Sequence, residues 1–157
     1  MPLVDGVSHI ATVTDDLDRM IGFYRRVFDA AVVGDVMEEE GLRHALIRLG
    51  PAVALHPFEV PGVRPDPRRE MFDRGRVDHF GVTVPDMATL LEVRNRLRAE
   101  GEDQTDGEIR DFGALYSLHY VDPDGVHLEV NLFKDGWDEI DMLERADWTT
   151  IEPEPVA

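Results

Sequence analysis

The feature that most constrains the fold is an internal repeat with a constant offset of 70 residues. Residues 7–17 (VSHIATVTDDL) match residues 77–87 (VDHFGVTVPDM), and each segment is an apolar, strand-like run that ends in aspartate. Helically spaced apolar residues follow Asp16 and Asp86, which are favourable helix N-caps. The repeat predicts two copies of one supersecondary unit, each too small to bury its own sheet face.

Both copies continue with strand-like segments after the helix. The predicted strands are 31–37, 44–49 and 53–58 in the first copy, and a weaker stretch near 102–109 with 114–121 and 126–133 in the second. Gly-Pro and Asp-Pro-Asp-Gly turns separate the last two strands of each copy. We therefore expect an α+β fold in which two paired βαβββ modules form one continuous curved mixed sheet around a central cavity, with helices on the outer face.

The composition along the chain predicts four parts. Residues 1–60 form the first module, 61–76 a Pro- and Arg-rich linker, 77–134 the second module and 135–157 an acidic C-terminal tail. The tail has eight acidic residues and one basic residue, and its apolar side chains are compatible with a short docked helix.

The composition also excludes several classes of partner and chemistry. A formal net charge of −17 argues against nucleic acid and anionic membranes, which require a basic face. There is no cysteine, so a metal would be held by His, Asp or Glu. No apolar run reaches the length of a membrane span, and the first residues lack a signal-peptide pattern. We expect a cytoplasmic protein.

Four side chains become metal-ligand candidates through the repeat. His9 and His79 occupy equivalent positions on the first strands, and strand alternation turns both away from the helix. Glu129 lies in the middle of an apolar last strand, and His56 takes its place in the first copy. Two-fold pseudosymmetry would bring these four together in the central cavity. This donor set suits Fe²⁺, Mn²⁺, Co²⁺, Ni²⁺ or Zn²⁺ better than Ca²⁺ or Mg²⁺.

Three segments resemble the vicinal oxygen chelate superfamily, also called the glyoxalase/bleomycin-resistance/extradiol-dioxygenase superfamily. They are the strand around His9 with its repeat around His79, the Tyr24-containing helix, and the segment YVDPDGVHLE that ends at Glu129. The resemblance implies paired βαβββ modules around a metal that binds two neighbouring oxygens of a small substrate, and commonly a homodimer. It places His9, His79 and Glu129 at ligand positions of the family and His56 at the fourth.

His56 departs from the glyoxalase I pattern, in which the fourth position is usually Glu, or Gln in some epimerases. The remaining trio resembles the facial triad of extradiol dioxygenases. His56 is either a fourth ligand or an acid or base that acts on the substrate. We favour an Fe²⁺ extradiol-type dioxygenase. The alternatives are a glyoxalase- or epimerase-like isomerase or lyase, and a non-catalytic resistance protein that binds a drug or metabolite.

The remaining site candidates come from strand alternation and proximity. Besides Glu129 and His56, Tyr120 is a candidate catalytic residue. The predicted cavity-lining residues are Tyr116, His119, His127 and Asn131. His44 is expected to be an ordinary strand residue. The repeat permits the two modules to pair within one chain or between two chains.

Overall fold

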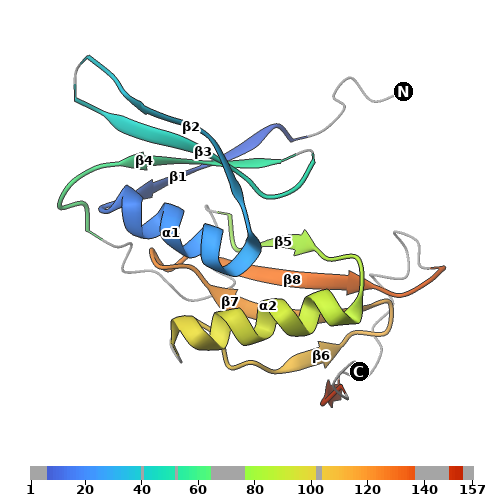
Figure 1. Ribbon diagram of the computed structural model, residues 1–157. Coiled ribbons are helices and arrows are strands. Elements are labelled where there is room, and N and C mark those ends of the chain that lie inside the picture. Colours follow the sequence, from blue (N-terminus) through green and yellow to red (C-terminus); the bar gives the residue numbers. More distant parts are fainter. Residues whose placement is uncertain are drawn as a thin grey trace. The chain divides into compact units, whose positions relative to one another are not determined.

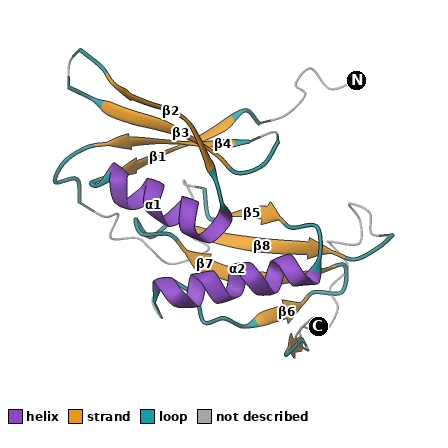
Figure 2. Ribbon diagram, in the orientation of Figure 1, coloured by secondary structure: helices purple, strands orange, loops and turns teal. Residues whose placement is uncertain are grey.

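The computed structural model describes residues 7–39, 41–51, 53–64, 77–101, 104–136 and 149–153. The chain forms two compact units, Met1–Pro67 and Arg68–Ala157. Figure 1 labels both helices and all strands but the last, and Figure 2 colours them by type.

The first unit is one mixed sheet with one helix. Its elements are β1 (His9–Thr14), α1 (Leu17–Phe28), β2 (Ala31–Met37), β3 (Arg43–Arg48) and β4 (Ala54–Glu59). The strand order is β1-β4-β3-β2. β1 runs parallel to β4, and the other neighbours are antiparallel.

Helix α1 covers one face of this sheet. Asp16 caps its first turn, since Asp16 Oδ1 accepts the Arg19 backbone N–H at 2.9 Å. Its apolar residues recur at helical spacing, and the side that they form is buried against β3 and β4. The core of the unit includes Leu17, Met20, Phe23, Tyr24, Ile47 and Leu55. The opposite face of the sheet has no helix among the described residues of this unit.

The second unit repeats this plan and adds a strand. Its elements are β5 (Phe80–Thr83), α2 (Met87–Glu100), β6 (Ile109–Asp111), β7 (Leu115–Val121), β8 (His127–Phe133) and β9 (Thr149–Ile151). The strand order is β5-β8-β7-β6-β9, with β5 parallel to β8. Asp86 caps α2, and the helix packs on β7 and β8.

The α+β class and the two βαβββ modules are confirmed. The expectation of one continuous sheet is corrected, because the hydrogen-bonded strands of the described residues form two sheets, one in each unit. In each module the first strand pairs with the last strand of the same module, so each ladder is complete within its own unit.

The second module differs from the prediction at β6 and β9. β6 begins only at Ile109, since Thr105 Oγ1 and Asp106 Oδ1 accept the N–H groups of Gly107 and Glu108 and make turns there. Strand β9 lies in the predicted tail and pairs with β6. The predicted tail helix and most of the linker, residues 137–148 and 65–76, lie outside the described residues. No helix among the described residues is long and apolar enough to cross a membrane.

Candidate functional site

The helix-free face of the first sheet presents three histidines. Leu55 and Ala45 are buried on the α1 side. Their strand neighbours His56 and His44 point to the other face, together with Phe58. His9 lies on the same face of β1, where alternate residues are exposed. The register pairs Ala11 with His56, and His9 lies two residues before Ala11 on β1. His9 and His56 are therefore diagonal neighbours on this face.

These rings are in contact with one another. The centroids of His9 and His56 lie 5.4 Å apart in an edge-to-face arrangement. His56 Nε2 and His44 Nδ1 are hydrogen-bonded at 3.0 Å, and His44 Nε2 lies 2.9 Å from Glu38 Oε1. Burial lowers the pKa of His56, and the neighbouring His44 and His9 lower it further. His56 is therefore a neutral imidazole at neutral pH.

His44 is a partner of the predicted site residue His56 that sequence reasoning missed. It was expected to be an ordinary strand residue, yet its ring is bonded to His56. The signal was the strand register across the Gly50-Pro51 turn. It pairs His44 with Phe58, which follows His56 on the same face of β4. Glu38 carried no comparable signal, because it lies beyond the end of β2.

The face of the second sheet opposite α2 presents a similar group. Glu129 lies opposite His119 on β7 and opposite Gly81 on β5. His119 Nε2 and His127 Nδ1 are hydrogen-bonded at 3.1 Å. Burial and the nearby His127 ring lower the pKa of His119, and the carboxylates of Asp106 and Glu129 only partly offset this. The structure thus brings together Glu129, His119 and His127 of the predicted site residues.

Asn131 joins this face from the same strand as Glu129. Its Nδ2 donates to Glu129 Oε2 at a long 3.4 Å, and its side chain is buried. A Cβ on Gly81 would lie 2.6 Å from Asn131 Nδ2. Glycine at position 81 therefore leaves the room in which the Asn131 amide lies beside Glu129.

His9 and His79 are both held through Nδ1 by the preceding residue. His79 immediately precedes β5, and its Nδ1 lies 2.7 Å from Asp78 Oδ2. A carboxylate at this distance accepts the Nδ1 proton and leaves Nε2 with the lone pair, as in many histidines that bind metals. His9 Nδ1 is likewise bonded to Ser8 Oγ at 3.0 Å.

The two tyrosines lie on the other face of β7. Tyr120 is fully buried and pairs with Leu128 on the α2 side of the sheet. Tyr116 pairs with Leu132, and Lys134 Nζ lies 4.5 Å from its ring centroid. The structure therefore does not bring Tyr116 or Tyr120 together with Glu129.

Two further observations concern ligand binding by the described residues. No group of three or more His, Asp or Glu side chains among them is already arranged to hold a metal ion. A cleft of about 440 Å³ in the second unit is lined by Arg98, Gly101, Thr105 and Asp106, which include no predicted site residue. Arg98 and Asp106 there bind Gly107 and Arg110, which indicates a structural role.

The fold and the residues on these faces define a member of a large superfamily. The model of the Glyoxalase/Bleomycin resistance protein/Dioxygenase superfamily matches residues 6–130, so the chain belongs to this superfamily. No curated protein matches the chain.

Several solved structures share the fold. A glyoxylase/bleomycin resistance protein/dioxygenase domain from Frankia sp. EAN1pec has a TM-score of 0.70 and 24% identity, over 85% of this chain and 96% of that chain. The fosfomycin resistance protein FosX from Listeria monocytogenes has a TM-score of 0.66 and 16% identity, over 89% and 99%. Lactoylglutathione lyase from Agrobacterium tumefaciens has a TM-score of 0.57 and 25% identity, over 83% and 96%.

Proposed function

We propose that this protein is a divalent-metal-dependent enzyme that binds a small substrate through two adjacent oxygen atoms. We assign the metal ligands to His9, His79 and Glu129, and acid–base chemistry to His56. The proposal takes one pair of side chains from each module and rests on the repeat and on superfamily membership. A homodimer and a cytoplasmic location stay predictions of the sequence.

The hydrogen bonds of the imidazole rings carry this assignment. His9 and His79 are bonded through Nδ1, which favours Nε2 as their ligand atom. His56 is instead bonded through Nε2, to His44. Coordination by His56 Nε2 would break that bond, so we assign to His56 acid–base chemistry through its other ring nitrogen. Glu129 supplies the negative charge that a divalent cation requires.

A divalent metal held by two imidazoles and a carboxylate would supply Lewis acidity to the substrate oxygens and, as Fe²⁺, an electron path to O₂. The chain's own residues would do the rest. The neutral ring of His56 is suited to take a proton from a substrate hydroxyl, because burial lowers its pKa. His119 and His127 present ring nitrogens on the face of Glu129, where they suit contacts with substrate oxygens.

We propose an Fe²⁺ extradiol-type dioxygenase as the particular activity, since three ligands leave positions for both a chelating diol and O₂. The second candidate is an isomerase, lyase or related enzyme that does not use O₂. This second candidate is supported by the solved structures with the same fold, because one of them is a lactoylglutathione lyase. A FosX structure contains Mn²⁺ and 1S,2S-dihydroxypropylphosphonic acid, a compound with two adjacent hydroxyl groups.

Metal analysis of protein purified without chelators tests the proposal. We expect about one transition metal ion per chain, and loss of most of it in His79→Ala and Glu129→Gln. His127→Ala is the matched control, because it removes an imidazole from the strand of Glu129 without removing a proposed ligand. Protein without stoichiometric metal, or His79→Ala with unchanged metal content, would contradict the proposal.

Oxygen uptake then separates the candidate activities. Fe²⁺-loaded protein is given a panel of catechols in an oxygen electrode, and a dioxygenase consumes one O₂ per diol cleaved. Product formation from a hydroxycarbonyl substrate without O₂ uptake would point to the isomerase or lyase. Stoichiometric retention of a compound without turnover would identify a binding protein and exclude the enzyme.

A further inference from the structure

Three side chains of the first unit form a hydrogen-bonded series that no role described so far explains. Glu38 Oε1 lies 2.9 Å from His44 Nε2, and His44 Nδ1 lies 3.0 Å from His56 Nε2. Glu38 follows β2, His44 lies on β3 and His56 on β4. The series therefore runs across the sheet, from the exposed end of the β2–β3 hairpin to His56.

The carboxylate gives this series a direction. An ionised carboxylate only accepts hydrogen bonds, so His44 donates from Nε2 to Glu38. A neutral imidazole with its proton on Nε2 accepts at Nδ1. His56 must then donate from Nε2 to His44. The lone pair of His56 is consequently on Nδ1.

Phe58 restricts the rings that form the series. Its ring stacks on His44 with centroids 5.3 Å apart and an interplanar angle of 28°. The ring of His56 lies 4.3 Å from that of Phe58. Contacts on both imidazoles limit rotation about their side-chain bonds, which keeps the two ring nitrogens within hydrogen-bonding distance.

We infer that Glu38 and His44 are positioning residues that hold His56 in its Nε2–H tautomer, with Nδ1 as the atom that accepts a proton from a substrate hydroxyl. The second half of this statement rests on the proposed function, whereas the tautomer does not. When the substrate O–H bond breaks, a new N–H bond forms at His56 Nδ1.

The series also allows the positive charge formed on His56 to be neutralised by proton transfer to Glu38. The Nε2 proton of His56 passes to His44 Nδ1, and the Nε2 proton of His44 passes to Glu38. The net result is one proton moved from the substrate to Glu38, with both rings neutral and protonated on Nδ1. The protons return along the series when the product takes a proton from His56 Nδ1, which restores the Nε2–H form of both rings. Half of the Glu38 side-chain surface is exposed, so water can solvate the protonated carboxyl group until the proton returns.

Long-range ¹H–¹⁵N correlation NMR on full-length protein with ¹⁵N-labelled histidine tests the tautomer directly. The spectra are recorded on metal-free protein near pH 8.5, about two units above the ordinary imidazole pKa. We expect Nε2–H signatures for both His44 and His56. An Nδ1–H signature for His56, or equal populations of the two tautomers, would overturn the inference.

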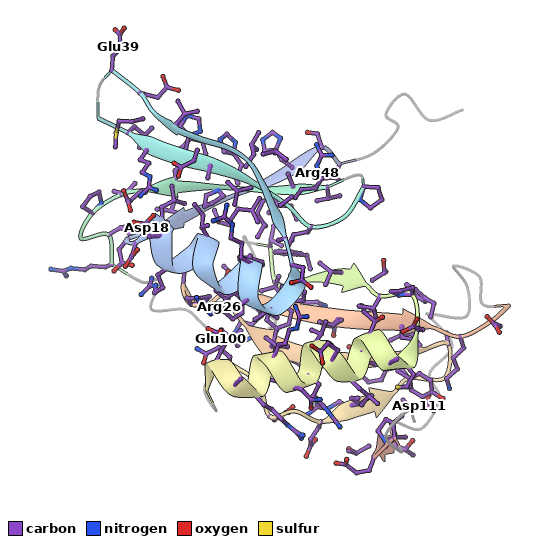
Figure 3. All side chains as sticks on the ribbon, viewed as in Figure 1. Asp18, Arg26, Glu39, Arg48, Glu100 and Asp111 are labelled. Carbon is purple, nitrogen blue, oxygen red and sulfur yellow. The ribbon has the colours of Figure 1, made fainter. Side chains whose placement is uncertain are left out.

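Variants of two neighbouring carboxylates provide the matched comparison. Glu38→Ala removes the acceptor, and we expect mixed tautomers at His44 and His56. Glu38→Gln retains an acceptor oxygen and should restore the Nε2–H form. Glu39→Ala is the control, because Glu39 lies at the tip of the same hairpin with its side chain directed away from the strands (Figure 3). If Glu38→Ala leaves the His56 tautomer unchanged, Glu38 does not position it.

The inference and the proposed function fail in different measurements. If the protein has no metal and no turnover but His56 carries its proton on Nε2, the proposed function is contradicted and the inference about Glu38 and His44 is supported. In active protein, we expect Glu38→Ala to lower kcat about 10-fold with little change in KM, as for other residues that act through a neighbour. If the enzyme is active but His56 carries its proton on Nδ1, the proposed function is supported and the inference about Glu38 and His44 is contradicted.

Discussion

At the scale of single residues, the missing side chain of Gly81 determines the surroundings of Glu129. Gly81 is the partner of Glu129 in the parallel β5–β8 pair. The space beside it contains the Asn131 amide, whose Oδ1 has no hydrogen-bond partner among the described residues. A buried amide oxygen without a partner is costly, so this side chain is held in place mainly by packing.

We therefore predict that Gly81→Ala is destabilising. The new methyl group would overlap Asn131 Nδ2 and push the amide away from Glu129, which we expect to cost about 1–2 kcal/mol. Urea denaturation measures this cost. Gly34→Ala is the control, because a Cβ there meets nothing within 4 Å. Equal effects of the two substitutions would show that the close approach to Asn131 is unimportant.

At the scale of elements, an ion pair joins the end of β6 to the residue after β8. Lys134 Nζ lies 2.7 Å from Asp111 Oδ1, and both side chains are partly buried. Burial alone would raise the pKa of Asp111, but hydrogen bonds from Lys134 and the Gly113 N–H outweigh it and lower that pKa. The pair stabilises the fold above the unfolded-state pKa of about 3.9 and stops doing so as pH falls through the lower folded-state pKa.

Lys134→Met should accordingly reduce stability at pH 7 by at most about 1 kcal/mol, as for other partly exposed pairs. The difference from the parent protein should shrink as the pH falls below about 4 and vanish below the lowered folded-state pKa, where Asp111 is protonated in both proteins. Denaturation midpoints between pH 7 and pH 3 measure this trend, with Lys134→Arg as the charge-retaining control. A difference that does not vary with pH would refute the contribution of Asp111.

The elements that sequence predicted best are those specified by local signals. Both helices follow an aspartate cap, and strands β7 and β8 flank an Asp-Pro-Asp-Gly turn, as predicted. β9 was missed because three β-branched residues are too short a run to predict a strand, and they gain their structure by pairing with β6.

The candidate site was predictable where alternation applied. Alternation predicted that His9, His56 and Glu129 face away from the helices, and the exposure and register of their strands agree with this prediction. The position of Tyr120 near the site was argued from proximity, whereas alternation along β7 places it under α2. The bond between His44 and His56 depends on side-chain rotamers, which no sequence pattern specifies.

At the scale of the whole molecule, the acidic composition should control stability more than function. The net charge of −17 produces repulsion that opposes the folded state. We predict that raising NaCl from about 10 mM to 0.5 M increases the thermal midpoint, because the Debye length falls from about 30 Å to a few Å. A gain of about 1 kcal/mol corresponds to roughly 3 °C at this chain length.

Thermal unfolding of the metal-free protein measures this effect, so that metal binding does not contribute. Sucrose at matched osmolality is the uncharged control. An unchanged or lower midpoint in NaCl would show that local ion pairs, such as those of Arg43 with Asp18 and Asp35, outweigh the general repulsion.

The pairing of β9 with β6 has a consequence for misassembly. An outer strand with unpaired amides invites another chain to add a strand to it. In the first unit, β2 is one of the two outer strands, and a bulge between Val32 and Gly34 together with the charge of Asp35 disfavours such addition there. In the second unit, residues 149–151 cover the equivalent edge. A chain cut before Thr149 would keep both repeats and still be prone to aggregate through β6.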